Sequence, residues 1–129
     1  MARPKTNPLT QRELEIMHVF WSESELEPTA AHVREKLAAQ GRDLAITTVA
    51  TLLSILVKKG YLRQTGPTRP HGYRALHTKE AVSGTILEDL VDRMFGGSAT
   101  ALLKCLSAQK ELTKRERARL EKFLRELEE

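Results

Sequence analysis

The chain has 129 residues and a net charge of +4, with 40% hydrophobic and 29% charged residues. This length allows one compact domain, or a small domain with a helical appendage, but excludes two full-size domains. A single cysteine, Cys105, excludes an intrachain disulfide and a thiolate-rich metal site. No apolar run reaches the roughly 18 residues of a membrane helix, and the basic N-terminus lacks the apolar segment of a signal peptide, so we expect a cytoplasmic protein without membrane insertion.

The N-terminal part of the sequence indicates an arm followed by a helix. Residues 1–8 hold two prolines and no periodicity, which predicts a flexible arm. Thr10-Gln11-Arg12-Glu13 then forms a capping-box pattern, which starts a helix that is expected to run to about Trp21. Because Ile16 and Val19 lie away from the main apolar face, this helix is expected to be covered on two sides.

Two further helices follow in the order of a DNA-binding core. After a polar loop over Ser22–Pro28, Thr29 is a natural N-cap for a helix through Gln40. Residues 43–46 are long enough only for a connector or a two-residue strand. A third helix is predicted over Thr47–Lys59, and Gly60 is expected to end it in the left-handed conformation. Three helices in this order, with the third as the recognition helix that reads DNA (the reader helix), are typical of helix-turn-helix proteins.

The predicted third helix joins an apolar stripe to a polar face without carboxylates. Its Val and Leu residues at positions 49, 52, 53, 56 and 57 recur at helical spacing and are expected to be buried. A buried stripe behind a face of short polar side chains suits entry into the major groove of DNA. The reader-helix residues predicted to contact DNA are Thr47, Thr48, Thr51, Ser54, Ile55 and Lys58.

After Gly60 the pattern indicates a β-hairpin. Residues 61–65 and 73–76 can each form a short strand, and residues 66–72 hold the glycines and prolines of a hairpin loop. Two strands after three helices make a winged helix. For His71, the histidine of this loop, an exposed side chain without a contact to DNA is an equally open interpretation. The wing residues predicted to reach phosphates or the minor groove are Arg63, Arg69, His71 and Arg74.

The wing lies in a stretch of sequence that is rich in cations and free of acids. Residues 44–79 contain no Asp or Glu, whereas six Lys or Arg residues occur between positions 58 and 79. A local basic field with nothing to cancel it is the footprint of a phosphate-binding surface. A solvated basic face is the alternative.

From Thr78 the sequence predicts three amphipathic helices separated by short breaks. Their apolar stripes are too extensive to be buried on the preceding domain, so we expect them to pack against a second copy of the chain. The predicted organisation is a winged-helix DNA-binding domain over residues 9–77 and a helical dimerisation domain over residues 78–129. The residues predicted at the dimer interface are Ile86, Leu87, Leu90, Met94, Leu102, Leu103, Leu106, Leu120, Phe123, Leu124 and Leu127.

With these elements placed, the chain resembles the penicillinase-repressor family of winged-helix transcription regulators, the BlaI/MecI type. The resemblance is carried by LTQRELEIMHVFW, TAAHVREKL, TTVATLLSILVKKGYL and GYRAL, and it spans about residues 9–127. The third segment is similar to the family pattern T-x-x-T-L-L-x-R-L-x-x-K-G. This chain has Ile55 where the family often has Arg, and an isoleucine there can touch a thymine methyl group.

The resemblance implies a homodimeric repressor that binds a pseudo-palindromic operator in double-stranded DNA. It also implies release by a signal acting on the C-terminal region, with a membrane-bound metalloprotease sensor as a partner. Family members that answer β-lactams are cleaved at an Asn-Phe pair, and the aligned pair here is Cys105-Leu106. Copper-responsive relatives carry paired C-terminal cysteines, whereas this chain has Cys105 alone, for which a small buried apolar residue and a redox switch are both open.

Two other classes of function compete with a DNA-binding repressor. A protein-interaction winged helix without direct DNA readout is the alternative, but the acid-free run over residues 44–79 argues against it. An enzyme fits least, because the four histidines show no metal-ligand spacing and the chain lacks a glycine-rich phosphate loop. The sequence therefore predicts no metal, no cofactor and no catalytic residue.

Overall fold

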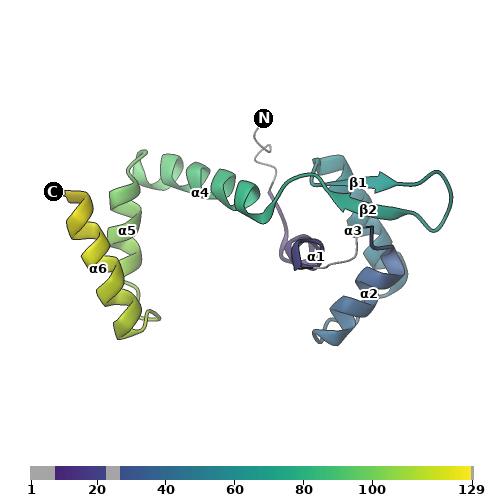
Figure 1. Cartoon of the computed structure of the whole chain (residues 1–129), viewed down its shortest axis with the longest axis horizontal. Coiled ribbons are helices and arrows are strands. Elements are labelled where there is room, and N and C mark those ends of the chain that lie inside the picture. The colour runs from purple at the N-terminus through teal and green to yellow at the C-terminus, as the bar shows by residue number, and fades with distance from the viewer. Residues whose placement is uncertain (1–7, 23–26, 129) are drawn as a thin grey trace. The chain divides into compact units, whose positions relative to one another are not determined.

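The structure is a computed structural model that describes residues 8–22 and 27–128. The chain divides into two compact units, Met1–Thr85 and Ile86–Glu129. The predicted mainly α fold, a winged helix followed by C-terminal helices, is confirmed; the predicted arm lies outside the described residues except for Pro8. The elements, labelled in Figure 1, are α1 (Gln11–Ser22), α2 (Ala30–Ala39), α3 (Ile46–Lys59), β1 (Leu62–Thr65), β2 (Gly72–Ala75), α4 (Lys79–Phe95), α5 (Ala99–Ser107) and α6 (Lys114–Glu128).

Helix α1 is the centre of the first unit. It starts with the predicted capping box, in which the Thr10 amide donates to Glu13 Oε1 at 3.0 Å and the Glu13 amide donates to Thr10 Oγ1 at 3.2 Å. It contacts α2, α3 and β2, and Val82 in the first turns of α4 joins the same buried cluster. The prediction that α1 is covered on two sides is therefore confirmed.

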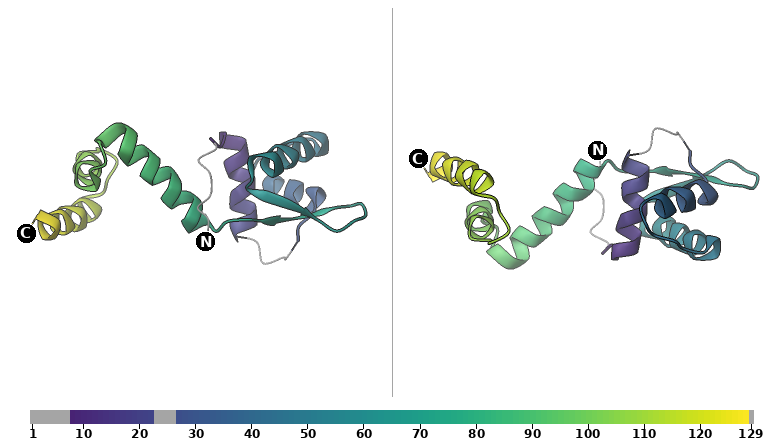
Figure 2. Two further views of the ribbon diagram at one scale, coloured as in Figure 1. Left: turned by 90° about the horizontal axis from the view of Figure 1, so that it is seen from above. Right: turned by 90° about the horizontal axis from the view of Figure 1, so that it is seen from below.

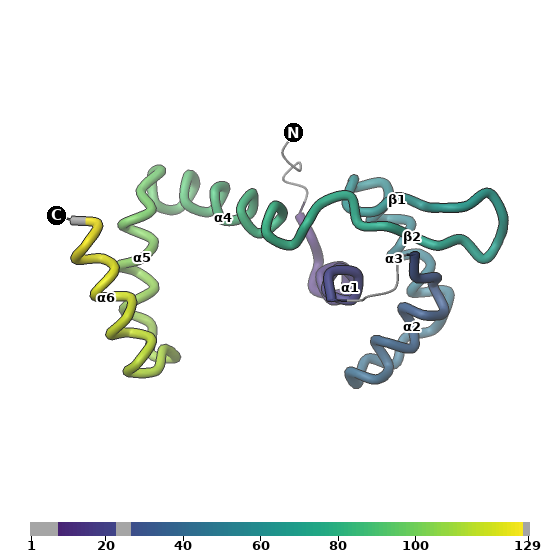
Figure 3. The backbone as a smooth tube through the Cα atoms, viewed as in Figure 1, coloured from purple at the N-terminus to yellow at the C-terminus, as the bar shows by residue number. Residues whose placement is uncertain are grey.

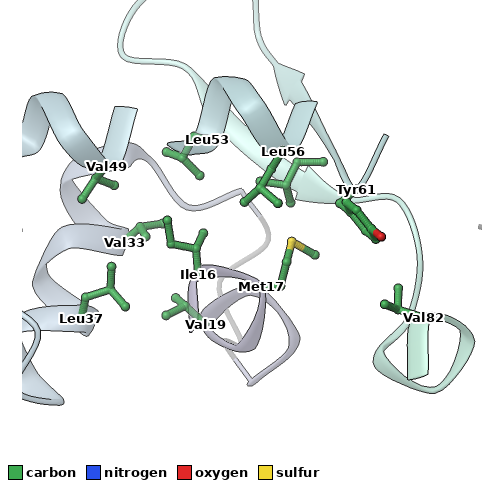
Figure 4. Packing of buried hydrophobic residues seen from close by; sticks show 11 residues of the cluster. Ile16, Met17, Val19, Val33, Leu37, Val49, Leu53, Leu56, Tyr61 and Val82 are labelled. Carbon is green, nitrogen blue, oxygen red and sulfur yellow. The ribbon is translucent and has the colours of Figure 1, made fainter. Parts of the chain in front are cut away.

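The core of this unit is built from α1, α2, α3 and the residues just after α3. Figure 4 shows Ile16 of α1 toward Val33 of α2, and Met17 toward Leu56 and Tyr61; all five side chains are at most 2% exposed. Figure 2 shows the three helices packed together, with the β-hairpin extending beyond them. Burying these side chains fixes the orientation of α3 on its supporting helices, because a close-packed core admits few arrangements.

The hairpin has a third partner that the sequence did not indicate. β1 and β2 pair antiparallel, with Leu62 opposite Ala75 and Arg63 opposite Arg74. The segment before α2 lies against β2, since Thr29 forms an antiparallel bridge with Gly72, and the Tyr73 amide donates to the Pro28 carbonyl at 3.1 Å. Glu27 and Pro28, the described end of the predicted loop over Ser22–Pro28, are irregular as predicted, but the Pro28 carbonyl is bonded to β2. Residues 23–26 of this loop lie outside the described residues.

The second unit contains the end of α4 together with α5 and α6, and α5 and α6 pack side by side (Figure 3). Ser98 caps α5 by accepting from the Ala101 amide at 3.1 Å, and Thr113 and Glu116 form the second predicted capping box, with both bonds at 3.1 Å. Arg117 of α6 donates through Nε to the Ser107 carbonyl at 2.9 Å, which ties the start of α6 to the end of α5. None of the described helices has the length and apolar character needed to cross a membrane.

Candidate nucleic-acid interface

Helix α3 has one side buried in the core and the opposite side exposed to solvent. Val49, Leu53 and Leu56 are completely buried, so one side of the helix is anchored in the core. At its end, Gly60 adopts φ 86°, as predicted, and the Tyr61 amide donates to the Leu56 carbonyl at 3.0 Å. This left-handed ending satisfies carbonyls of the last turn and returns the chain toward β1.

The exposed face of α3 carries the short polar side chains that the helical pattern placed there. Thr47, Thr51, Ser54 and Lys58 are exposed, whereas Thr48 and Ile55 are half-buried. The Thr51 hydroxyl donates to the Thr47 carbonyl at 2.9 Å. Because this bond uses the only hydroxyl hydrogen, Thr51 can act toward a ligand only as an acceptor.

The start of α3 differs from that of the other helices. In α1, α2, α4, α5 and α6, a threonine or serine hydroxyl accepts a hydrogen bond from a first-turn amide. Helix α3 follows Ala45, which makes no such bond. The first-turn amides of α3 therefore receive no capping bond from their N-cap side chain.

The basic field around α3 is smaller than the sequence suggested. Lys59 Nζ lies 2.6 Å from Glu13 Oε1 and donates to the Pro8 carbonyl at 2.7 Å. Glu13 is only 3% exposed. Burial raises the pKa of Glu13, but hydrogen bonds from Lys59 and the Thr10 amide outweigh it, so the pKa lies below its ordinary value. The prediction that no acid offsets this positive charge is wrong, because Glu13, which lies outside the acid-free residues 44–79, forms an ion pair with Lys59.

The wing carries cations in two different situations. Arg74 Nη2 lies 3.7 Å from Glu27 Oε1, with both side chains 48% exposed, so this charge is partly balanced. Arg63 and Arg69 are exposed and form no ion pair with any described residue. His71 Nδ1 lies 3.1 Å from the Gly66 carbonyl, and this contact helps close the hairpin loop. Arg63 and Arg69 are thus the wing cations best placed to take a phosphate.

The position of the wing depends on a glycine. A Cβ at Gly72 would lie 2.7 Å from the Glu27 carbonyl oxygen and 2.9 Å from Thr65 Oγ1. Distances this short leave no room for a side chain, so Gly72 allows the segment before α2 to lie directly against β2. The glycine of the GYRAL motif therefore connects the wing to the start of α2.

A groove of about 810 Å³ lies in the first unit, beside α3. From α3 it is lined by Ile46, Ala50 and Ser54, which follow one another at intervals of one turn. The other lining residues come from the start of α2, β1, β2 and the hairpin loop, and these are Thr29, Ala30, Ala31, Gln64, Arg69, Pro70, His71 and Tyr73. The groove brings together two of the predicted wing residues and one predicted reader residue, Ser54.

The second unit leaves most of its apolar stripes uncovered. Of the predicted dimer residues, Leu124 is buried and Leu102, Leu103 and Leu120 are half-buried. The remaining seven are between 41% and 70% exposed, and these are Ile86, Leu87, Leu90, Met94, Leu106, Phe123 and Leu127. So much exposed apolar surface on one small unit is typical of a surface that is covered by a partner.

Cys105 lies in α5 and is exposed, so its interpretation as a small buried residue is wrong for the single chain. The side-chain Nε2 of Gln109 donates to the Cys105 carbonyl at 3.2 Å. Leu106, its neighbour at the family cleavage position, is 43% exposed. Within the part of the chain that the structure describes, no group of three or more His, Cys, Asp or Glu side chains is placed to hold a metal ion.

With this geometry in hand, comparison with known proteins decides the family. The model of the family described as penicillinase repressor matches residues 9–126. The chain belongs to the penicillinase-repressor family. It is therefore a transcriptional regulator of the BlaI type and not an enzyme, and the resemblance found in the sequence is confirmed.

Named relatives of the family are similar over most of the chain. The transcriptional regulator BlaI of Mycobacterium tuberculosis is 37% identical over 100 residues, which is 77% of this chain and 71% of that relative. Two solved structures are more loosely similar in shape. The ferric uptake regulator of Francisella tularensis has a TM-score of 0.48 and 17% identity, over 76% of this chain and 87% of that one. PerR of Streptococcus pyogenes has a TM-score of 0.46 and 13% identity, over 73% of this chain and 76% of that one.

Two features of the interface were missed in the sequence. The pairing of Lys59 with Glu13 joins residues far apart in the chain, although helical spacing already placed Lys59 beside Leu52, at the edge of the buried stripe. Ile46 was assigned to the connector, whereas it begins α3 and is 42% exposed. Helical spacing puts Ile46 in line with the buried Leu53, seven residues on, so no sequence pattern indicates that Ile46 is exposed.

Proposed function

We propose that the chain is a repressor that binds a pseudo-palindromic operator as a homodimer, with one α3 in each of two major grooves and the wings on the adjacent backbone. One observation carries this proposal: α3 has an exposed face free of acids beside the wing cations, and its opposite side is anchored by the completely buried Val49, Leu53 and Leu56. A helix held in this way can enter the major groove, and the adjoining cations can neutralise phosphates.

The side chains of α3 would divide the reading of bases among them. Thr47, Ser54 and Lys58 are exposed and can donate to the acceptors of purine and thymine edges. Thr51 can only accept, because its hydrogen is used by the Thr47 carbonyl. It would therefore favour the exocyclic amino group of adenine or cytosine.

The wing and the end of α3 would supply the contacts to phosphate. In each protomer these come from Lys58, Arg63 and Arg69, with Arg74 joining them if it leaves Glu27. Lys59 is excluded from this set by its bonds to Glu13 and Pro8. Phosphate contacts set the register of the protein on the duplex but carry no direct information about base sequence.

The second unit would form the dimer. Its exposed apolar side chains, such as Met94 and Phe123, are 70% and 50% exposed in the single chain. Covering them with the same surface of a second copy removes this area from water and gives the two-fold symmetry that a pseudo-palindromic site requires.

Release from DNA would act through this dimer surface. The position aligned with the family cleavage pair, Cys105-Leu106, lies inside α5, and a cut there would divide that helix. A membrane-bound metalloprotease sensor is the partner that family membership suggests. Another signal that separates the two copies would have the same effect on the DNA-bound dimer.

Sequencing the genomic DNA fragments that the purified full chain retains tests the proposal. A shared inverted repeat is expected in the retained fragments. Arg69→Ala should then weaken binding to every fragment alike, whereas Thr51→Ala should change the preferred bases within the repeat. Equal losses on all sequences from both variants, or fragments without any shared repeat, would contradict the proposed readout.

A further inference from the structure

We propose that Ile46, at the start of α3, reads the C5-methyl group of a thymine in each half of the operator, with Ala50 beside it. This inference rests on the proposed function, because it names one base contact of the same DNA-binding surface. It moves the apolar base contact from Ile55, where the sequence suggested it, to the first residue of the helix.

The exposure of Ile46 is the first observation. Among the described residues of the first unit, the large apolar side chains that are exposed are Ile46 (42%) and Leu76 (45%). A single exposed isoleucine is common on protein surfaces and would not by itself indicate a contact. Ile46 differs because it lies beside Thr47 on the part of α3 that is proposed to enter DNA. In helix-turn-helix proteins, the N-terminal residues of the recognition helix contact base edges.

The groove beside α3 is the second observation. Ile46, Ala50 and Ser54 follow one another at intervals of one turn and line the same groove of about 810 Å³. Arg69 lines this groove from the wing. Apolar side chains from α3 and a cation from the wing match the two parts of a DNA strand, which offers a thymine methyl group in the major groove and a phosphate on its backbone.

The two isoleucines of α3 lie on different sides of the helix. They are separated by nine residues, which turns them about 180° apart on a helix of 3.6 residues per turn. Ile55 is half-buried and does not line the groove. The two isoleucines therefore cannot contact the same base, and the exposed Ile46 is the better candidate for a contact with thymine.

The chemistry of the contact is specific for a methyl group. An isoleucine cannot donate to or accept from a base edge, so its only discriminating partner in the major groove is the thymine C5-methyl. Burying one methyl group changes a binding constant by about fourfold. With one such contact in each half-site, the effect on a dimer is about 15-fold.

The test compares thymine with uracil, which lacks only the methyl group. A duplex selected by the full chain from a random library is prepared once with dT and once with dU at the one symmetric pair of thymines, one in each half-site, whose replacement weakens wild-type binding most, and both duplexes are titrated against the wild type, Ile46→Ala and Ile55→Ala. The wild type should bind the dT duplex about 15-fold more tightly. Ile46→Ala should reduce this ratio to near one, and Ile55→Ala should keep it. Because alanine is the strongest helix former, Ile46→Ala should fold normally, which a thermal melt checks.

Each outcome decides the inference. Equal binding of dT and dU duplexes by the wild type would overturn it and would leave the proposed repressor function intact. Loss of the ratio in Ile55→Ala, but not in Ile46→Ala, would also overturn it and would return the contact to Ile55. Failure of the wild type to select any duplex would instead count against the proposed function itself.

Discussion

Two adjacent lysines at the end of α3 are expected to have separate roles, one in stability and one in DNA binding. Lys59 Nζ lies 2.6 Å from Glu13 Oε1, and the two side chains are 28% and 4% exposed. Lys59→Met removes the ammonium group from a buried carboxylate that also accepts from the Thr10 amide. Breaking a fully buried ion pair from one side costs about 3–5 kcal/mol. Since Lys59 is partly open to water, we expect a loss of about 2–3 kcal/mol.

Trp21, the only tryptophan of the chain, lies in the first unit and gives a fluorescence signal for its unfolding. For a domain of this size, the expected loss corresponds to a fall in the melting temperature of about 10–20 °C. The salt dependence of DNA binding should be unchanged in Lys59→Met, because this lysine contacts no phosphate in the proposed complex.

Lys58→Met is the matched control, since it removes the same charge one residue earlier. Lys58 is exposed and forms no ion pair with a described residue, so its stability should stay within about 0.5 kcal/mol of the wild type. Its DNA binding should weaken, with a flatter salt dependence. Equal stability losses in both lysine variants, or a Lys59→Met protein as stable as the wild type, would refute the structural role of the Glu13–Lys59 pair.

Three further predictions concern the wing, the effect of acid and the second unit. Gly72→Ala should lower the free energy of unfolding in denaturant by about 1–3 kcal/mol, because its Cβ would lie 2.7 Å from the Glu27 carbonyl oxygen. In the control Gly84→Ala the added Cβ meets nothing within 4 Å, so this variant should not be destabilised. Equal effects of the two substitutions would contradict this prediction. The lowered pKa of Glu13 means that its contribution to stability is present above about pH 4.3 and is lost as the pH falls through the folded-state pKa, so Glu13→Gln should destabilise at pH 7 and not near pH 2. Met94→Glu should shift the sedimentation mass from dimer to monomer, because the side chain is 70% exposed in the single chain, and an unchanged mass would exclude Met94 from the interface.

Local pattern was enough to predict most of the fold. The two capping boxes at Thr10 and Thr113, the glycine that ends α3 and the apolar stripe at Val49 each follow from spacing within one element. Such features depend on neighbours three or four residues away, so the sequence displays them directly. The hairpin followed for the same reason, because its turn residues are concentrated between its two strands.

The structural features that the sequence did not predict depend on contacts between distant segments of the chain. The salt bridge from Glu13 to Lys59 joins the first helix to the third, and the close approach of Glu27 to Gly72 joins a loop to a strand. Neither contact has a periodic signal within one element. Charge counting along the sequence therefore overestimated the free cations of the interface, and only the folded chain shows that Lys59 is engaged.

The salt dependence of DNA binding tests the central claim most directly. Lys58, Arg63, Arg69 and an Arg74 that has left Glu27 in each of two protomers would neutralise about 8 phosphates, so the logarithm of the association constant should fall with the logarithm of salt concentration at a slope near −7. The measurement is a titration of the full chain with a selected duplex between about 50 and 200 mM salt. A slope near −7, with a stoichiometry of two chains per duplex, is the predicted result. A slope of about −1 or flatter would contradict binding through α3 and the wings of a dimer.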